Sequence, residues 1–387
     1  MIKLYDLDSY TKEFSAKVVT CEENNDGNYR VILDQTAFFP TAGGQTCDTG
    51  VIGDEQVLDV IIEDETVIHI LKNPIAVGEA VNCRIDWDVR FRKMQHHSAE
   101  HIVSGLATKM FNCDNVGFHL SDKEVTIDYN REFTDSDLIL LEQKANEAVW
   151  ANLEIDARYP DENELPNIPY RAKLYLTENV RIVTIPGVDI CACCAPHVRR
   201  TGEIGIIHLK DMMRHRGGVR IRMICGRDAL LDYEEKAKSV LSISNLLSAK
   251  QDEVADATAK LLSQIADKNQ RITALTKELA VLKLEKVQKT DGNICIFEED
   301  ADNDTLRLLA NLGKEKAGGV FCAMSGNDQK GYTYIIISEN VNLRDWAKDI
   351  NSALSGRGGG REDMIQGSFS ATREEIEKYF GDFLKGE

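Results

Sequence analysis

Four histidine and cysteine residues have the types and spacing needed to bind a metal ion. His97 and His101 are four residues apart, and nearly a hundred residues later Cys193 and His197 are again four apart. Side chains four apart on a helix lie on one face, so the two imidazoles can close on a single ion. Zinc prefers cysteine sulfur and histidine nitrogen in a tetrahedral set of four. The sequence therefore predicts one zinc ion per chain.

The residues around these ligands leave alternatives open. Cys191, Cys193 and Cys194 crowd together and are candidates for redox thiols, although they lack the Cys-x-x-Cys spacing. Cys194 is a second candidate ligand, but Cys193 keeps the four-residue spacing to His197. His96 points about 100° away from its neighbour on a helix, which indicates a surface residue or one that supports a ligand.

A helix must present the first ligand pair, and a connection between strands must present the second. Apolar residues at helical spacing predict a helix from about residue 87 past residue 110: Phe91, Met94, Ile102, Leu106 and Met110. A second helix is expected at 135–152. Strands are expected at 125–129, 180–185, 204–209 and 219–225. We interpret residues 89–228 as an α+β, zinc-binding domain.

Residues 1–88 are expected to form a small β-barrel. β-Branched and apolar runs at 18–20, 29–33 and 57–62 are separated by Asn-Asp-Gly and Gly-Asp turn signals. Short strands at this spacing are typical of small barrels.

Residues 229–288 are predicted to form a long helix or a helical hairpin. The stretch lacks proline and glycine, and its apolar residues follow a heptad pattern with polar interruptions. Two outcomes fit this pattern, a coiled coil that makes a homodimer and a hairpin that folds back on the body.

Residues 289–387 are interpreted as a separate α/β domain. The segment 355–364 is rich in glycine and contains Arg357 and Arg361, so we expect a glycine-rich loop there. Exposed backbone N–H groups beside guanidinium charge can bind phosphate. A flexible connector before the last helix is the alternative.

The charge balance limits the partners. The 387 residues contain 46 Lys and Arg against 64 Asp and Glu, a net charge of −18, which argues against a general polyanion binder. A local basic face can still contact nucleic acid. Basic residues cluster at Arg90, Arg92 and Lys93, at Arg199 and Arg200, and at Arg214, Arg216, Arg220 and Arg222.

The compartment is expected to be the cytoplasm, with no membrane association. The first residues lack the basic and apolar regions of a signal peptide, and no apolar run approaches the roughly 20 residues of a membrane span. The ten cysteines are scattered, as is typical of proteins in a reducing compartment.

Three segments together resemble a known family. Residues 34–48, 97–101 and 193–205 resemble the editing domain of alanyl-tRNA synthetase, and more closely the free-standing alanyl-tRNA editing proteins of the long form (AlaX type). The glycine segment at 356–364 resembles the DHH-associated C-terminal domain of that form. The resemblance covers essentially the whole chain and is specific only in the combination of its motifs.

The resemblance implies the ligand set and the activity. In that family zinc is bound by the residues that match His97, His101, Cys193 and His197. The family usually has Gly-Gly-Thr between the last two ligands, whereas this chain has Cys-Ala-Pro at 194–196. The implied activity is that of a trans-editing aminoacyl-tRNA deacylase, which hydrolyses the ester of alanine tRNA charged chiefly with serine. Activity on glycine-charged tRNA is left open.

The resemblance also implies roles for single residues. Thr36 matches the position that reads the serine hydroxyl, and Gln45 lies on the same loop. Gly43 and Gly44 would permit close approach of the tRNA end. Glu100 is a candidate for positioning water, while zinc either activates that water or orients the substrate.

Two other functions remain as hypotheses. A non-catalytic, zinc-containing tRNA-binding protein would use the same ligands with the metal fully coordinated. A phosphoesterase is disfavoured because the sequence lacks an Asp-His-His motif or another cluster for two metals. Arg357 and Arg361 favour contact with tRNA, whereas the heptads favour self-association.

Overall fold

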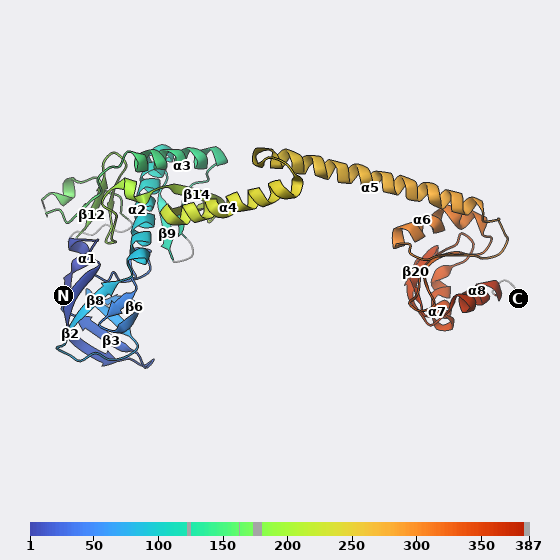
Figure 1. Ribbon diagram of the computed structural model, residues 1–387, viewed down its shortest axis with the longest axis horizontal. Helices are drawn as coiled ribbons and strands as arrows, with labels where there is room; N and C mark the ends of the chain where they lie inside the picture. Colours follow the sequence, from blue (N-terminus) through green and yellow to red (C-terminus); the bar gives the residue numbers. More distant parts are fainter. Residues whose placement is uncertain (122–124, 162, 173–179, 383–387) are drawn as a thin grey trace. The chain divides into compact units, whose positions relative to one another are not determined.

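The computed structural model describes residues 1–121, 125–161, 163–172 and 180–382. The chain divides into two compact units, Met1–Ser242 and Ile243–Glu387. Both units combine helices and strands, so the protein has the mixed α+β architecture expected from the sequence (Figure 1).

Six strands of the first unit close into a barrel in the order β2-β3-β7-β6-β5-β8. The alternation of buried and exposed residues explains why the strands close around a core. In β8, Val81, Cys83 and Ile85 are buried inside, and their neighbours face outward. The barrel strands are β2 (Glu13–Glu23), β3 (Tyr29–Leu33), β5 (Gly50–Ile52), β6 (Glu55–Glu63), β7 (Thr66–Leu71) and β8 (Ala80–Ile85). Beside the barrel lie β1 (Ile2–Lys3), α1 (Leu4–Leu7) and β4 (Gln35–Thr36).

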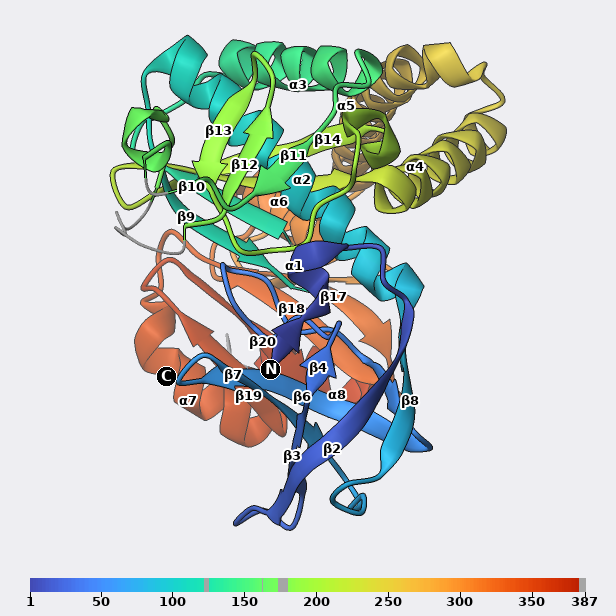
Figure 2. The same ribbon diagram turned by 90° about the vertical axis from the view of Figure 1, so that its left-hand side faces the viewer.

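The helix predicted to carry the first ligand pair is α2 (Trp87–Phe111). It runs from the barrel to two sheets and a second helix, α3 (Figure 1, Figure 2). Residues on all its sides are buried between Met94 and Ala107, and Asn112 closes it in the left-handed conformation. Helix α3 (Asp135–Trp150) begins with a capping box made by Thr134.

The two sheets around α2 are antiparallel. One has the order β14-β15-β10-β9 and the other β11-β12-β13. Their strands are β9 (Asn115–Leu120), β10 (Val125–Tyr129), β11 (Asp156–Arg158), β12 (Ile182–Ile185), β13 (Asp189–Ala192), β14 (Ile207–His215) and β15 (Gly218–Cys225). Short 3-10 helices lie at Leu165–Asn167 and Thr201–Ile204.

The predicted basic cluster at the start of α2 is not a surface feature. Arg90 and Lys93 are almost fully buried. The Lys93 ammonium donates to the Cys47 carbonyl oxygen at 2.5 Å, and Arg90 pairs with Asp48. These cations therefore hold the barrel loop and are not available to a nucleic acid.

The segment predicted as a long helix contains two helices, α4 (Gly226–Leu247) and α5 (Val254–Glu285). Ser248 adopts the left-handed conformation with φ 51°, which ends α4 without glycine or proline. A 3-10 turn at Gln251–Glu253 precedes α5. The apolar residues of α5 remain largely exposed, as at Ile272.

The second unit is a five-stranded sheet in the order β16-β17-β18-β20-β19, with helices on both faces. Residues of β17 alternate between two cores: Phe321 packs with α5 and α6, and Cys322 packs with α7 and α8. Its strands are β16 (Ile294–Glu298), β17 (Phe321–Asn327), β18 (Gly331–Ile337), β19 (Gly356–Gly360) and β20 (Met364–Phe369). Its helices are α6 (Asn303–Gly313), the 3-10 turn Lys314–Lys316, α7 (Leu343–Ala353) and α8 (Arg373–Asp382).

The glycine-rich segment is an edge strand, so the prediction of a loop there is wrong. Gly356–Gly360 pairs antiparallel with β20 along its whole length. A Cβ on Gly358 would lie 2.3 Å from the Gln366 carbonyl oxygen and 2.4 Å from the Tyr334 hydroxyl. Glycine is therefore required by close packing in the sheet.

Among the described residues, no helix combines the length and the apolar character that crossing a membrane requires.

We predict that Asp48→Asn strongly destabilises the first unit. Asp48 Oδ1 accepts from Arg90 Nε at 2.9 Å, and neither side chain is exposed. Removing the carboxylate charge leaves a buried cation without its counter-charge, which costs about 3–5 kcal/mol. Urea unfolding followed by circular dichroism measures the change.

The control is Glu65→Gln, which removes the exposed partner of Lys3. Exposed pairs contribute less than about 1 kcal/mol, so this variant should unfold like the wild type. Equal stability of the two variants would contradict the prediction.

Candidate metal centre and cavity

The structure brings the four predicted ligands together. The ligand atoms of His97, His101, Cys193 and His197 all lie within 4.8 Å of one another. Helix α2 supplies the first two, and the segment after β13 supplies the others. The Cys193 sulfur is 3.4 Å from His97 Nε2, and the centroids of the His101 and His197 rings are 4.8 Å apart.

Hydrogen bonds at the far side of each α2 imidazole orient the ring. His97 Nδ1 lies 2.9 Å from Gln45 Oε1, and His101 Nδ1 lies 2.9 Å from Asp189 Oδ2. In both rings Nδ1 therefore donates, and Nε2 faces the centre of the cluster. Such partners fix the tautomer of a metal-ligating histidine.

Several buried atoms of the cluster lack a hydrogen-bond partner among the described residues. They are His101 Nε2 and both ring nitrogens of His197. Buried polar atoms without partners are unfavourable, and a metal ion would satisfy His101 Nε2 and one of the two His197 nitrogens. One sulfur and three nitrogens match the donor set of zinc, so the residues present fit the predicted ion.

The protonation states suit a cation. Burial would raise the pKa of Cys193, but His97 and His197 hold it well below its ordinary value, which favours the thiolate. Burial lowers the pKa of His197 to about 3, so this imidazole is neutral. Thiolate and neutral imidazole are the forms that bind metal.

The structure distinguishes the three neighbouring cysteines. Cys193 points into the cluster, whereas Cys194 is exposed and is not among its members. Cys191 groups with His101 and Asp189, on the other side of the His101 ring. The spacing argument for Cys193 therefore agrees with the geometry.

Close packing brings Asp189 to His101. A Cβ on Gly105 would lie 2.5 Å from the Val188 carbonyl oxygen and 2.7 Å from Asp189 Cβ, so only glycine lets β13 approach α2 this closely. Arg171 Nε and Nη2 donate to the two Asp189 oxygens at 2.8 Å each. Burial raises the pKa of Asp189, but His101 and Arg171 outweigh this and keep it ionised.

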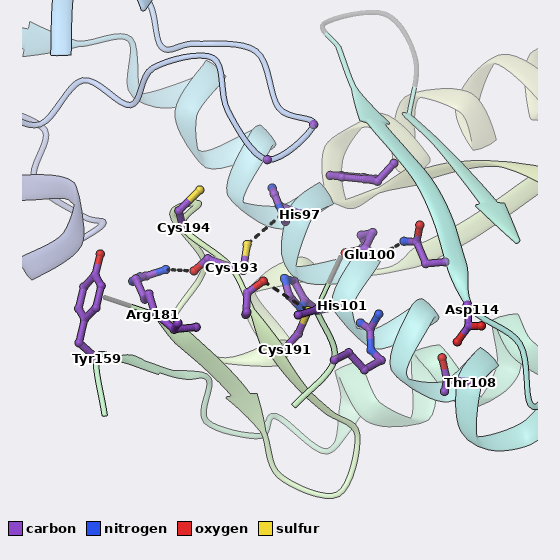
Figure 3. A pocket seen from close by; sticks show the side chains of 18 residues that line it. His97, Glu100, His101, Thr108, Asp114, Tyr159, Arg181, Cys191, Cys193 and Cys194 are labelled. Atoms are coloured by element: carbon purple, nitrogen blue, oxygen red, sulfur yellow. Dashed lines mark hydrogen bonds between the residues drawn. The ribbon is translucent and has the colours of Figure 1, made fainter. Parts of the chain in front are cut away.

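A cavity of about 580 Å³ opens beside the cluster, a volume typical of small-ligand sites. Figure 3 shows Tyr159, Arg181 and Cys194 on one side of His97 and His101, and Glu100, Thr108 and Asp114 on the other. The other lining residues are Gly43, Gly44, Asn115, Phe118, Arg171, Ala172, Val180, Cys191, Ala192 and Cys193.

Glu100 lies in this cavity with a fixed orientation. Its Oε1 accepts hydrogen bonds from Ser104 Oγ and Asn115 Nδ2, both at 2.6 Å. Ser104 also contacts the buried Tyr129 hydroxyl at 3.0 Å. The Glu100 carboxylate is thus a preoriented hydrogen-bond acceptor, directly before the metal ligand His101 in the sequence.

The two predicted glycines border the cavity. Gly43 and Gly44 have φ values of 59° and 83°, in the left-handed region that favours glycine. Leu120 N donates to the Gly44 carbonyl oxygen at 2.7 Å, which joins this loop to β9. A Cβ on Gly43 would lie 3.9 Å from His97 Cε1, so the loop backbone passes directly over the cluster.

Thr36 and Gln45 do not line the cavity. Thr36 is fully buried, accepts from Phe38 N at 3.1 Å and contacts His69 Nε2 at 2.8 Å. His69 Nδ1 faces the Val31 carbonyl oxygen at 3.1 Å, and burial lowers the pKa of His69 to about 4. The neutral ring therefore donates through Nδ1, and Thr36 donates its proton to Nε2.

Arg357 and Arg361 belong to the second unit, where both are exposed on or just after the edge strand β19.

His96 was expected at the surface or beside a ligand. It is instead fully buried and contacts the backbone at Arg92 and Cys225.

Sequence reasoning missed several polar residues of the site. They are His69, Tyr159, Arg171, Arg181 and Asp189. Of these residues, only Asp189 could have been found from the sequence, because it lies two residues before the first cysteine of the cluster.

Three family models match the chain in order. They describe class II tRNA synthetases of the alanine type at residues 6–89, the second additional domain of threonyl and alanyl tRNA synthetases at 180–223, and the DHHA1 domain at 279–385. These matches show the class of protein to which the chain is similar: synthetases of the alanyl-tRNA type, together with a DHHA1 domain.

Comparison with individual curated proteins makes this similarity more specific. The chain is 30% identical to an alanine–tRNA ligase of Pyrococcus abyssi, over 97% of this chain but 43% of that protein. It is 27% identical to the alanyl-tRNA editing protein AlaX-L of Pyrococcus horikoshii, over 97% of this chain and 96% of that protein. For the alanyl-tRNA editing protein Aarsd1 of Rattus norvegicus the identity is 24%, over 97% of both chains. The chain is therefore similar over its whole length to long-form alanyl-tRNA editing proteins, which confirms the resemblance seen in the sequence.

We predict that Asp189→Asn lowers zinc affinity about 10–100-fold without removing a ligand. The amide cannot supply the charge that holds the His101 ring in place, and loss of such partners has this effect on metal sites. Competition with a chromogenic chelator measures the affinity.

The matched control is Asp54→Asn, an exposed carboxylate on a barrel turn. It should bind zinc like the wild type. An unchanged affinity in Asp189→Asn would show that the ring is held by packing alone.

Proposed function

We propose that this protein is a trans-editing aminoacyl-tRNA deacylase that hydrolyses mischarged alanine tRNA, chiefly the serine ester, with a zinc ion in the described cluster. The observation that carries the proposal is the cluster of three histidines and one cysteine at the wall of a cavity. Relatives of matching length are named alanyl-tRNA editing proteins, which supports the substrate class.

Hydrolysis adds water across the ester carbonyl and releases serine and the terminal hydroxyl of tRNA. Zinc held by His97, His101, Cys193 and His197 would orient the amino acid or, by accepting the ester as a fifth ligand, polarise its carbonyl. Gln45 acts indirectly, since it fixes the His97 ring. Glu100 accepts a hydrogen bond from the attacking water, because its carboxylate is preoriented at the cavity.

The glycines and Thr36 contribute to substrate choice. Gly43 and Gly44 leave room for the end of the tRNA at the cavity. Thr36 donates to His69 and accepts from Phe38, which leaves one lone pair on its hydroxyl. Because Thr36 is fully buried and does not line the cavity, we propose that binding of the charged tRNA opens a path to this lone pair. The lone pair then accepts the proton of the serine hydroxyl, and alanine is rejected because it has none.

Recognition of the tRNA body is assigned to the second unit. Arg357 and Arg361 present guanidinium groups at an exposed strand edge, where a phosphate backbone can approach. The exposed apolar residues of α5 support self-association into a homodimer as a separate property.

The decisive experiment compares serine and alanine esters of alanine tRNA. The zinc-loaded wild type should hydrolyse the serine ester at least about 100-fold faster, because a site built for a hydroxyl strongly rejects its absence. His97→Ala should lose both zinc and hydrolysis, whereas His119→Ala, an exposed histidine outside the cluster, should keep both. A zinc-loaded protein without hydrolysis would instead support the non-catalytic tRNA-binding alternative.

We predict that Thr36→Val, which keeps the side-chain shape, lowers the serine-to-alanine preference about tenfold or more. The substitution removes the proposed acceptor for serine but leaves the metal ligands untouched. Measured kcat/KM for both esters, together with zinc content, checks this. An unchanged preference would remove Thr36 from the specificity site.

We predict that Arg357→Ala and Arg361→Ala each raise KM for charged tRNA and reduce the salt dependence of binding by about one counterion. The value of kcat should not change, because both residues lie in the second unit. Arg344→Ala, another exposed arginine of that unit, is the control. Equal KM values for all three variants and the wild type would contradict this role.

A further inference from the structure

One side of the cavity carries polar residues that neither the metal cluster nor Glu100 uses. Tyr159 follows β11 directly, and Arg181 precedes β12 directly; both line the cavity (Figure 3). Asp6, from α1, contacts both of them. The three residues come from distant parts of the first unit and meet beside the ligand segment.

Asp6 and Arg181 present a buried carboxylate oxygen and a buried N–H group that both lack a partner in the described part of the chain. Asp6 Oδ1 and Arg181 Nε are buried and have no hydrogen-bond partner among the described residues. They lie 4.0 Å apart, too far for a direct hydrogen bond. A hydroxyl oxygen roughly 2.8 Å from each would bridge them, since it donates to a carboxylate and accepts from a guanidinium.

Both side chains are held in place by their other atoms. Arg181 Nη1 donates to the carbonyl oxygens of Cys193 and Ala195 at 3.2 and 2.8 Å. Asp6 Oδ2 accepts from the Tyr159 hydroxyl at 3.1 Å. Both groups are therefore preoriented, and Arg181 is tied to the backbone of a metal ligand.

Tyr159 offers an aromatic surface at the same place. It is 50% exposed although its ring lines the cavity. Burial of the hydroxyl end raises the pKa of Tyr159 to about 12, so the phenol stays protonated and keeps its bond to Asp6. A half-exposed ring with a fixed hydroxyl is a stacking platform for a nucleic acid base.

We propose that Tyr159, Asp6 and Arg181 form the subsite for the terminal nucleoside of the tRNA. The base stacks on Tyr159, and the ribose hydroxyl next to the ester bridges Asp6 Oδ1 and Arg181 Nε, which move apart slightly to admit it. The ester then extends toward the metal cluster, because Arg181 is bonded to the Cys193 carbonyl. This subsite rests on the proposed deacylase function and specifies how that substrate binds.

Stacking is tested with full-length, zinc-loaded protein and uncharged alanine tRNA whose terminal adenine is replaced by 2-aminopurine. Binding to the wild type should quench the fluorescence. Tyr159→Ala should abolish the quench and weaken binding about tenfold, while Tyr159→Phe keeps the quench. Tyr233→Ala, an exposed tyrosine on α4 outside the cavity, should behave like the wild type. A full quench in Tyr159→Ala, with normal zinc content, would overturn the stacking.

The hydroxyl is tested with a second RNA whose terminal ribose is 2′-deoxy. For the wild type the deoxy end should weaken binding about tenfold, and Asp6→Asn should weaken binding of the normal RNA by a similar factor. Asp6→Asn should not distinguish the two RNAs. If the wild type binds both RNAs equally, the hydroxyl assignment is overturned.

These readouts separate the subsite from the proposed function. A wild type that quenches 2-aminopurine but does not hydrolyse the serine ester would sustain the subsite and defeat the deacylase proposal. Normal hydrolysis with unchanged quenching and KM in Tyr159→Ala would defeat the subsite alone.

Discussion

Arg90 places a buried cation where α2 meets the barrel, and Asp48 is the carboxylate that neutralises it. The same guanidinium donates to the carbonyl oxygens of Ser9 and Ala37, so both ends of the 37–48 loop are fastened to one helix. A buried cation without these partners is strongly unfavourable, so the loop must return to α2. Because the loop returns to α2, Gln45 reaches His97, which lies about two helical turns after Arg90.

The metal centre is therefore assembled by two separate approaches to α2. The barrel loop orients His97 through Gln45, and β13 orients His101 through Asp189, which requires the glycine at 105. Cys193 and its partner His197 enter from the same side as β13. Ligand binding and folding are coupled in such a site, since buried ligand atoms gain their partner only from the ion.

The sequence predicted what depends on local periodicity and failed where tertiary contacts decide. The helical spacing of His97 and His101 and the choice of Cys193 needed only local geometry. Arg90 resembled surface charge because nothing nearby in the sequence shows that its partner is Asp48. The glycines of β19 resembled a loop because the strand that requires their small size, β20, pairs through the tertiary fold.

The arginines of the two units have different surroundings, which indicates separate roles in tRNA affinity and in substrate selectivity. A chain with a net charge of −18 repels a polyanion at long range, so binding of tRNA must use local cations. In the first unit, Arg171 and Arg181 are committed to Asp189 and to backbone carbonyls, and they serve the cavity rather than a phosphate backbone. Arg357 is exposed, and its Nε donates to the Ser368 hydroxyl at 3.4 Å, so its guanidinium stays accessible to a phosphate. Substitutions in the two units should therefore act on different kinetic constants, kcat and selectivity in the first and KM in the second.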